Sequence, residues 1–81
     1  MKKWMYVRTN GYDMIVKIDG ETARVLTQTE DFPNSNDPEA VEIFMSEVID
    51  WDYSDGWDEF PAAEILEDIN EHDEIVWQVE A

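Results

Sequence analysis

The fold is decided by residues 3–28, which read KWMYVRTNGYDMIVKIDGETARVLTQ. Two dipeptides in this stretch, Asn10-Gly11 and Asp19-Gly20, are typical of two-residue hairpin turns. They separate three runs that are rich in β-branched and aromatic residues, which favour strands. The stretch therefore predicts a three-stranded antiparallel meander.

Two-residue turns also fix which side chains share a face of the meander. They pair Met5 with Val16 and Val7 with Met14, and they pair Val16 and Met14 onward with Ala23 and Val25. These six residues form an apolar face that another element must cover. The opposite face is predicted to meet solvent, because it mixes aromatic, apolar and charged side chains: Trp4, Tyr6, Arg8, Asp13, Ile15, Lys17, Thr22, Arg24 and Leu26. On that face Trp4 is expected across from Lys17, and Arg8 across from Asp13.

A first helix is predicted over residues 38–50, after a polar loop at 29–36. Asp37 is a suitable N-cap and Pro38 suits the first helical position. Apolar residues then recur at helical spacing, at Val41, Phe44, Met45 and Val48. The outer side of this helix would carry Glu39, Glu42, Glu47 and Asp50.

A second helix is predicted over about residues 60–70, with its start left open by Phe60-Pro61. Its period buries Ala62, Ile65, Leu66 and Ile69 and exposes Glu64, Glu67, Asp68 and Glu71. The closing run from Glu74 to Val79 is predicted to add a fourth strand to the sheet. We therefore expect one α+β domain over residues 1–81, in the order β-β-β-α-α-β, with both helices covering the apolar sheet face in two layers.

Charge divides the chain sharply. All five basic residues lie within the first 24 positions, whereas 18 of the 21 acidic residues follow them, and the formal net charge is −16. Strongly acidic chains are often disordered, but this one is rich in aromatic and β-branched residues, which indicates a folded domain. Such a charge repels nucleic acid and anionic membranes, so neither is an expected direct partner.

Other features limit the chemistry. The chain has no cysteine, which excludes disulfides, thiol nucleophiles and thiolate metal sites. No apolar run is long enough for a signal peptide or a membrane span, so a cytoplasmic location is expected. The single histidine, His72, is expected to end the second helix, and no phosphate loop or nucleophile elbow is present. We expect neither enzymatic activity nor a cofactor.

The acidic helices are the first candidate for a binding surface. Four carboxylates between Glu64 and Glu71 give roughly one charge per 3–4 Å of helix axis, at about 1.5 Å per residue. Duplex DNA carries about one charge per 1.7 Å over both strands, a density that two such helices side by side would approach. The alternative is an acidic face that serves only solubility.

The segment from Asp50 to Glu59 is the second candidate, because its oxygen-rich spacing between two helices is similar to a calcium loop. The match fails in detail: Asp55 stands where the loop requires glycine, and Pro61 where it requires the bidentate glutamate. No metal ligand is therefore assigned. The aromatic residues Trp51, Tyr53 and Trp57 in or beside this segment are interpreted as core residues or, alternatively, as anchors at an interface.

The basic and aromatic sheet face is the third candidate. Trp4, Tyr6, Arg8, Lys17 and Arg24 are the ingredients of a stacking platform for single-stranded nucleic acid. The net charge opposes that function, and cation–π contacts and ion pairs between neighbouring strands explain the same residues without a ligand.

The small size, the meander and the absence of bases from the helical half together resemble a class of proteins, the small acidic inhibitors of phages and mobile elements. This class includes anti-CRISPR proteins and anti-restriction DNA mimics. The resemblance implies a protein inhibitor that competes with DNA for a basic cleft. It carries over no functional residue, because no motif matches residue for residue.

The leading hypothesis is a non-enzymatic protein that binds a basic, nucleic-acid-binding protein partner. The alternative is a small acidic adaptor or structural subunit of a larger assembly. The residues predicted to contact the partner are Glu39, Glu42, Glu47, Asp50, Trp51, Asp52, Asp55, Trp57, Asp58, Glu59, Glu64, Glu67, Asp68 and Glu71.

Overall fold

Two tight turns build the first part of the sheet. The computed structural model describes residues 2–51 and 56–80. In it β1 (Lys2–Thr9), β2 (Tyr12–Asp19) and β3 (Thr22–Thr27) follow one another as antiparallel neighbours. Gly11 and Gly20 take φ angles of 93° and 63°, a left-handed conformation that glycine adopts without strain. The predicted three-stranded meander is therefore confirmed.

The sheet extends beyond the meander on both sides. In the part of the chain that the structure describes it has five antiparallel strands, in the order β4-β3-β2-β1-β5. The edge strand β5 (Glu74–Glu80) confirms the predicted fourth strand. The other edge strand, β4 (Asp58–Pro61), was not predicted, and it takes the residues where the second helix was expected to begin. Pro61 suits an edge, since it cannot donate to a further strand.

The pairing of β2 with β3 differs from the prediction by two residues. Val16 faces Val25 instead of Ala23, and Ala23 faces Ile18. The reason is that the turn consists of Gly20 and Glu21, between the paired residues Asp19 and Thr22. A shift of two residues keeps every side chain on its predicted face, because the side chains of a strand alternate with a period of two.

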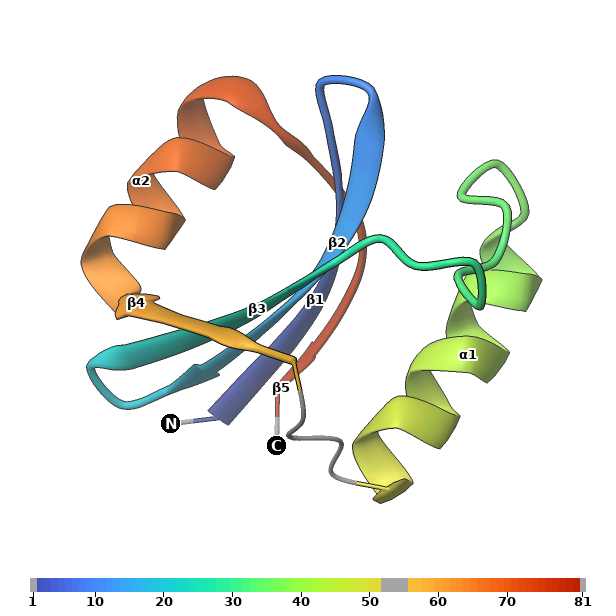
Figure 1. The fold of residues 1–81 in the computed structure, drawn as a ribbon, viewed down its shortest axis with the longest axis horizontal. Coiled ribbons are helices and arrows are strands. Elements are labelled where there is room, and N and C mark those ends of the chain that lie inside the picture. The colour runs from blue at the N-terminus through green and yellow to red at the C-terminus, as the bar shows by residue number, and fades with distance from the viewer. Residues whose placement is uncertain (1, 52–55, 81) are drawn as a thin grey trace.

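The helices lie on opposite faces of the sheet (Figure 1), so the predicted two-layer arrangement is wrong. Helix α2 (Ala62–His72) covers the predicted apolar face, and α1 (Pro38–Trp51) covers the face that was expected to meet solvent. The first core joins Ala62, Ile65 and Ile69 to Met5, Val7, Met14, Val16, Ile18, Ala23 and Val25. The second core joins Val41, Met45 and Val48 to Trp4, Tyr6 and Ile15. The predicted α+β class is confirmed, but the domain has three layers, with the sheet between the two helices.

The second core lies on the face that was expected to meet solvent. Trp4 and Tyr6 are only 4% and 0% exposed, although they alternate with residues that are equally buried on the other face. Continuous burial along a strand is typical of a sheet that is covered on both sides. The charged residues Arg8, Lys17 and Arg24 made this face resemble a solvated surface, whereas they flank an apolar centre.

Local signals place the helices well. The Asp37 carboxylate accepts a hydrogen bond from the Ala40 N–H at 3.3 Å, which confirms the predicted cap of α1. The start of α2 is fixed differently, since its N-cap has no side-chain hydrogen bond and the Ala62 N–H donates to the Glu21 carbonyl at 2.8 Å. His72 ends α2 as predicted, but Leu66 is 39% exposed and does not belong to the buried set. Within the described residues, no helix is long and apolar enough to cross a membrane.

The three-layer arrangement predicts a large difference between two neighbouring positions of α1. Met45 is fully buried against the sheet, whereas Ile43 is 57% exposed on the outer side. Met45→Ala should lower the free energy of unfolding by about 2–5 kcal/mol, because it leaves a cavity. Ile43→Ala should change it by about 0.5 kcal/mol or less. Urea unfolding measures both, and equal effects would contradict the packing of α1 on this face.

Candidate functional site

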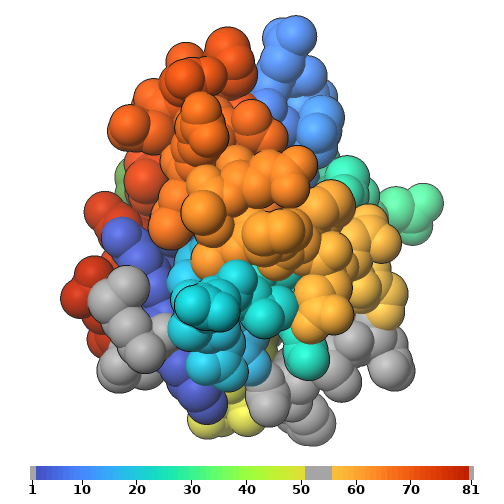
Figure 2. Space-filling view, turned by 90° about the vertical axis from the view of Figure 1, so that its left-hand side faces the viewer, coloured from blue at the N-terminus to red at the C-terminus, as the bar shows by residue number. Residues whose placement is uncertain are grey.

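The outward side of α2 carries a continuous acidic ridge, which we call the α2 ridge and define by Glu64, Glu67, Asp68 and Glu71. Apolar residues at Ala62, Ile65 and Ile69 turn the opposite side of the helix toward the sheet. All four acids are consequently exposed, at the spacing i, i+3, i+4 and i+7 that lines up one helix face. Figure 2 shows α2 lying across this side of the molecule, with β4 beside it.

The outward side of α1 carries a second set of acids, the α1 ridge, defined by Glu39, Glu42, Glu47 and Asp50. Burial of Val41, Met45 and Val48 directs these acids to solvent, and all four are exposed. The exposed Ile43 lies among them. The α1 ridge is therefore acidic with one apolar side chain, whereas the α2 ridge carries only the half-exposed Leu66 beside its acids.

The two ridges do not join into one surface. The sequence hypothesis compared two helices side by side with a DNA duplex, but the whole sheet separates α1 from α2 (Figure 1). The separation follows from the two apolar faces of the sheet, each of which takes one helix. Acidic surface is thus presented on both sides of the molecule.

The helix acids have almost no internal partners. In the described ranges, the acids of α1 form no ion pair, and on α2 the one contact with a possible base is that of the Glu71 carboxylate, 3.6 Å from the His72 ring nitrogen Nε2. Ion pairs also join β1 to β5, between Lys3 and Glu80 and between Arg8 and Glu74. Both helix surfaces therefore present negative charge that is almost uncompensated among the residues that the structure describes.

The bases are all on the first three strands. Lys2, Lys3 and Arg8 lie on β1, Lys17 on β2 and Arg24 on β3. Lys17 places its ammonium 4.9 Å from the centre of the Trp4 ring, and it faces Trp4 across the hairpin as predicted. These bases serve the sheet and its connections, and none lies on a helix.

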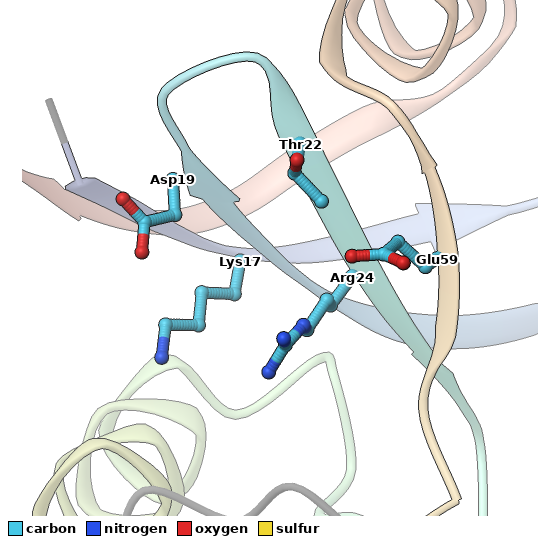
Figure 3. A pocket seen from close by; sticks show the side chains of 5 residues that line it. All are labelled: Lys17, Asp19, Thr22, Arg24 and Glu59. Carbon is cyan, nitrogen blue, oxygen red and sulfur yellow. The ribbon is translucent and has the colours of Figure 1, made fainter.

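The face with bases and aromatic rings is not a stacking platform. Trp4 and Tyr6 are buried beneath α1, so their rings are closed to a nucleobase. Next to Trp4 on the same face lies a polar pocket, lined by Lys17, Asp19, Thr22, Arg24 and Glu59 (Figure 3). Lys17 and Arg24 extend there toward the same side from paired positions of β2 and β3. Glu59 faces Arg24 from β4.

The segment between the helices is only partly described. Asp52, Tyr53 and Asp55 lie outside the described residues, as does the side chain of Trp51, so the calcium-loop hypothesis lies there too. Trp57 packs edge-on against Trp4, with ring centroids 6.2 Å apart, which agrees with its interpretation as a core residue. Within residues 2–51 and 56–80, no three His, Asp or Glu side chains are arranged to hold a metal ion.

A buried pair of titratable groups joins β1 to β2 next to the loop before α1. The Tyr6 hydroxyl donates a 2.8 Å hydrogen bond to the Asp13 carboxylate, and Asp13 is only 7% exposed. Burial raises the pKa of Tyr6 far above its ordinary value of 10, and the hydrogen bond and charge of Asp13 raise it further. Arg8 holds the same loop from outside, through hydrogen bonds to Ser35 and Asn36. The fully buried Tyr6 is closed to a substrate, so the pair acts as a brace.

The structure adds one feature that the sequence analysis missed, an apolar groove beside α1. Phe32 was assigned to a polar connecting loop and Leu26 to a solvated sheet face, yet both line this groove together with Phe44 and Val48. The available signal was a phenylalanine inside an otherwise polar segment, because an aromatic side chain in a loop indicates that the loop packs against another part of the protein.

Comparison with known proteins adds no further constraint. A scan against protein-family models, a search of curated protein sequences and a search of solved structures each gave no match to this chain. Function is therefore inferred from the charge and geometry of the surfaces described above.

The brace predicts a measurable dependence of stability on pH. Tyr6→Phe should lower the free energy of unfolding by about 1–3 kcal/mol near neutral pH, because the buried Asp13 carboxylate loses its donor. In the wild-type protein the neutral Tyr6 stabilises the fold fully below about pH 10. This contribution is lost as the pH rises further, by at most about 1.4 kcal/mol per pH unit.

Urea unfolding at about pH 8 and about pH 11 tests this, with the exposed Tyr12→Phe as the matched control. The difference in stability between wild type and Tyr6→Phe should shrink at the higher pH, whereas Tyr12→Phe should follow the wild type at both. A difference that stays constant would contradict the raised pKa.

Proposed function

We propose that this protein is a non-enzymatic inhibitor that binds the nucleic-acid-binding surface of a basic protein partner. The observation that carries the proposal is the pair of exposed acidic ridges, whose charge is almost uncompensated within the described residues. Basic side chains that line a phosphate-binding groove respond to charge placement before they read sequence. Carboxylates at helical spacing would occupy such a groove in place of phosphates.

The energetics of the α2 ridge support a partner. Like charges at i, i+3 and i+4 each cost a helix a few tenths of a kcal/mol, and four acids in seven residue steps accumulate several such pairs. Helix propensity does not account for the aspartate at position 68, since aspartate is among the weaker helix formers. The cost is relieved when lysine and arginine side chains approach the ridge.

The opposite placement of the ridges suits a cleft better than a flat surface. A cleft that encloses a duplex contacts phosphates of both strands, and therefore from more than one side. The α1 and α2 ridges present acids on two sides of one small molecule (Figure 1). A partner with basic walls on both sides would contact both ridges at once, whereas a flat basic surface would meet only one.

The proposal predicts that this protein captures nucleic-acid-binding proteins and that duplex DNA releases them. The immobilised protein should retain nucleic-acid-binding proteins, identified by mass spectrometry, from a nuclease-treated bacterial lysate, and duplex DNA should displace them. Retention should fall steeply with added salt, because exposed charges more than about 8 Å apart are screened at physiological ionic strength. A retained complex that DNA does not displace would instead indicate the adaptor function.

Charge reversal identifies the surface. Glu64→Lys, Glu67→Lys and Asp68→Lys combined should reduce retention roughly tenfold or more, since close charge pairs at an interface contribute several kcal/mol. The control carries the same change of net charge elsewhere, at the exposed residues Asp19, Glu21 and Glu30. Circular dichroism checks that both variants fold. An equal loss in both would show that only total charge matters, and unchanged retention in the first would exclude the α2 ridge.

A further inference from the structure

The apolar groove lies between α1, the end of β3 and the loop that leads into α1. Its volume is about 530 Å³, within the range of roughly 300–1,000 Å³ that is usual for binding pockets. Its apolar walls come from Leu26, Phe32, Phe44 and Val48, and its acidic rim from Asp31 and Asp58. No lysine or arginine is among the residues that line it in the described chain.

The aromatic wall of the groove is fixed by contacts beneath it. The rings of Phe32 and Phe44 are 5.2 Å apart, and both pack against the buried ring of Tyr6, at 5.9 Å and 6.3 Å. The loop that carries Phe32 is also held by Arg8, whose guanidinium donates hydrogen bonds to Ser35 and Asn36. A wall held in this way is formed before a ligand arrives, which lowers the entropic cost of binding.

The opposite wall is set by the chain at Gly56. Its φ of 81° is one that side-chain-bearing residues rarely adopt, and a Cβ there would lie 3.9 Å from Leu26 Cδ1. The backbone therefore passes directly beside Leu26, and the next residues lead to the exposed Asp58 on β4. Apolar side chains on one side and a carboxylate on the other thus face the same space.

We infer that this groove receives one large apolar side chain, flanked by lysine or arginine, from a basic protein segment of the partner. The occupant follows from charge complementarity, because the apolar walls suit an aromatic or aliphatic anchor and the carboxylates of Asp31 and Asp58 attract bases on either side of it. A second copy of this chain is disfavoured, since each copy carries a net charge of −16. An anionic membrane is repelled for the same reason.

The inference deepens the proposed function and rests on it for the basic character of the partner. The acidic ridges supply long-range attraction and a fast encounter, but charge on its own discriminates weakly among basic proteins. An apolar anchor in a preformed groove supplies the buried contact on which affinity commonly depends. The groove thereby selects which basic protein is held.

Two synthetic peptides separate the anchor from the charge: acetylated and amidated Lys-Lys-Phe-Lys-Lys, and the same peptide with serine in place of phenylalanine. Binding is measured by NMR titration of the full chain. The phenylalanine peptide should bind roughly tenfold more tightly or better, because only it buries an aromatic ring. Its shift changes should centre on Leu26, Phe32, Phe44 and Val48.

Two leucines provide matched variants. Leu26→Ala removes a wall of the groove and should abolish the preference for the phenylalanine peptide, whereas the half-exposed Leu66→Ala on α2 should retain it. Circular dichroism establishes that each variant is folded. If Leu26→Ala does not fold, the comparison of the two peptides on the wild-type protein, with its map of shift changes, still decides the question.

The outcomes distinguish the two proposals. Equal binding of both peptides, with shifts along the helix ridges, overturns the groove and leaves the acidic binding surface supported. A phenylalanine preference whose shifts map elsewhere also overturns the groove. Absence of binding by either peptide in low salt contradicts the groove and the acidic surface together.

Discussion

The whole molecule depends on a sheet that is apolar on both faces. Strands β1 and β2 bury consecutive side chains, from Trp4 to Val7 and from Asp13 to Val16, so neither face can be left in water. Burial of apolar area stabilises by roughly 25 cal/mol per Å², and in so short a chain both faces are needed to offset the entropy of folding. One helix on each face satisfies this constraint.

Charge follows from the same constraint. Each helix uses one side to cover the sheet, which leaves its other side free of any packing requirement. On these outer sides the chain places acids, while all its bases remain on β1, β2 and β3. There Arg8 and Lys3 join the sheet to a loop and to β5, and Lys17 packs over Trp4. These contacts of the bases therefore lie around the sheet, and the outer sides of the helices are left strongly negative.

The groove arises where the second core is incomplete. Trp4, Tyr6 and Ile15 are buried beneath α1, whereas Leu26, near the end of β3, is only partly buried and lines the groove with Phe32, Phe44 and Gly56. An exposed apolar surface with a polar rim commonly marks a site of interaction. Long-range attraction by the ridges and short-range selection by the groove would then act on one partner in sequence.

The sequence by itself determined the features that depend on neighbouring residues. Asn10-Gly11 gave the first turn with its register, Asp37 capped α1, and the helical period of Ile65 and Ile69 placed α2 within two residues. The separation of the bases from most of the acids along the chain also follows directly from the sequence. These signals are local because turn geometry, capping and periodicity involve residues only a few positions apart.

Only the tertiary structure decided which face each helix covers, and with it the separation of the two acidic ridges. Both sheet faces are apolar at their centres, so the pattern of the strands does not say which one receives α1. Strand β4, four residues with a proline and two acids, has no strand signal of its own and forms because β3 offers an open edge. The packing of Tyr6 against Phe32 and Phe44, and the approach of Gly56 to Leu26 at the groove, likewise join segments distant in sequence. Contacts of this kind form only when long-range burial offsets the entropy of closing the intervening loops.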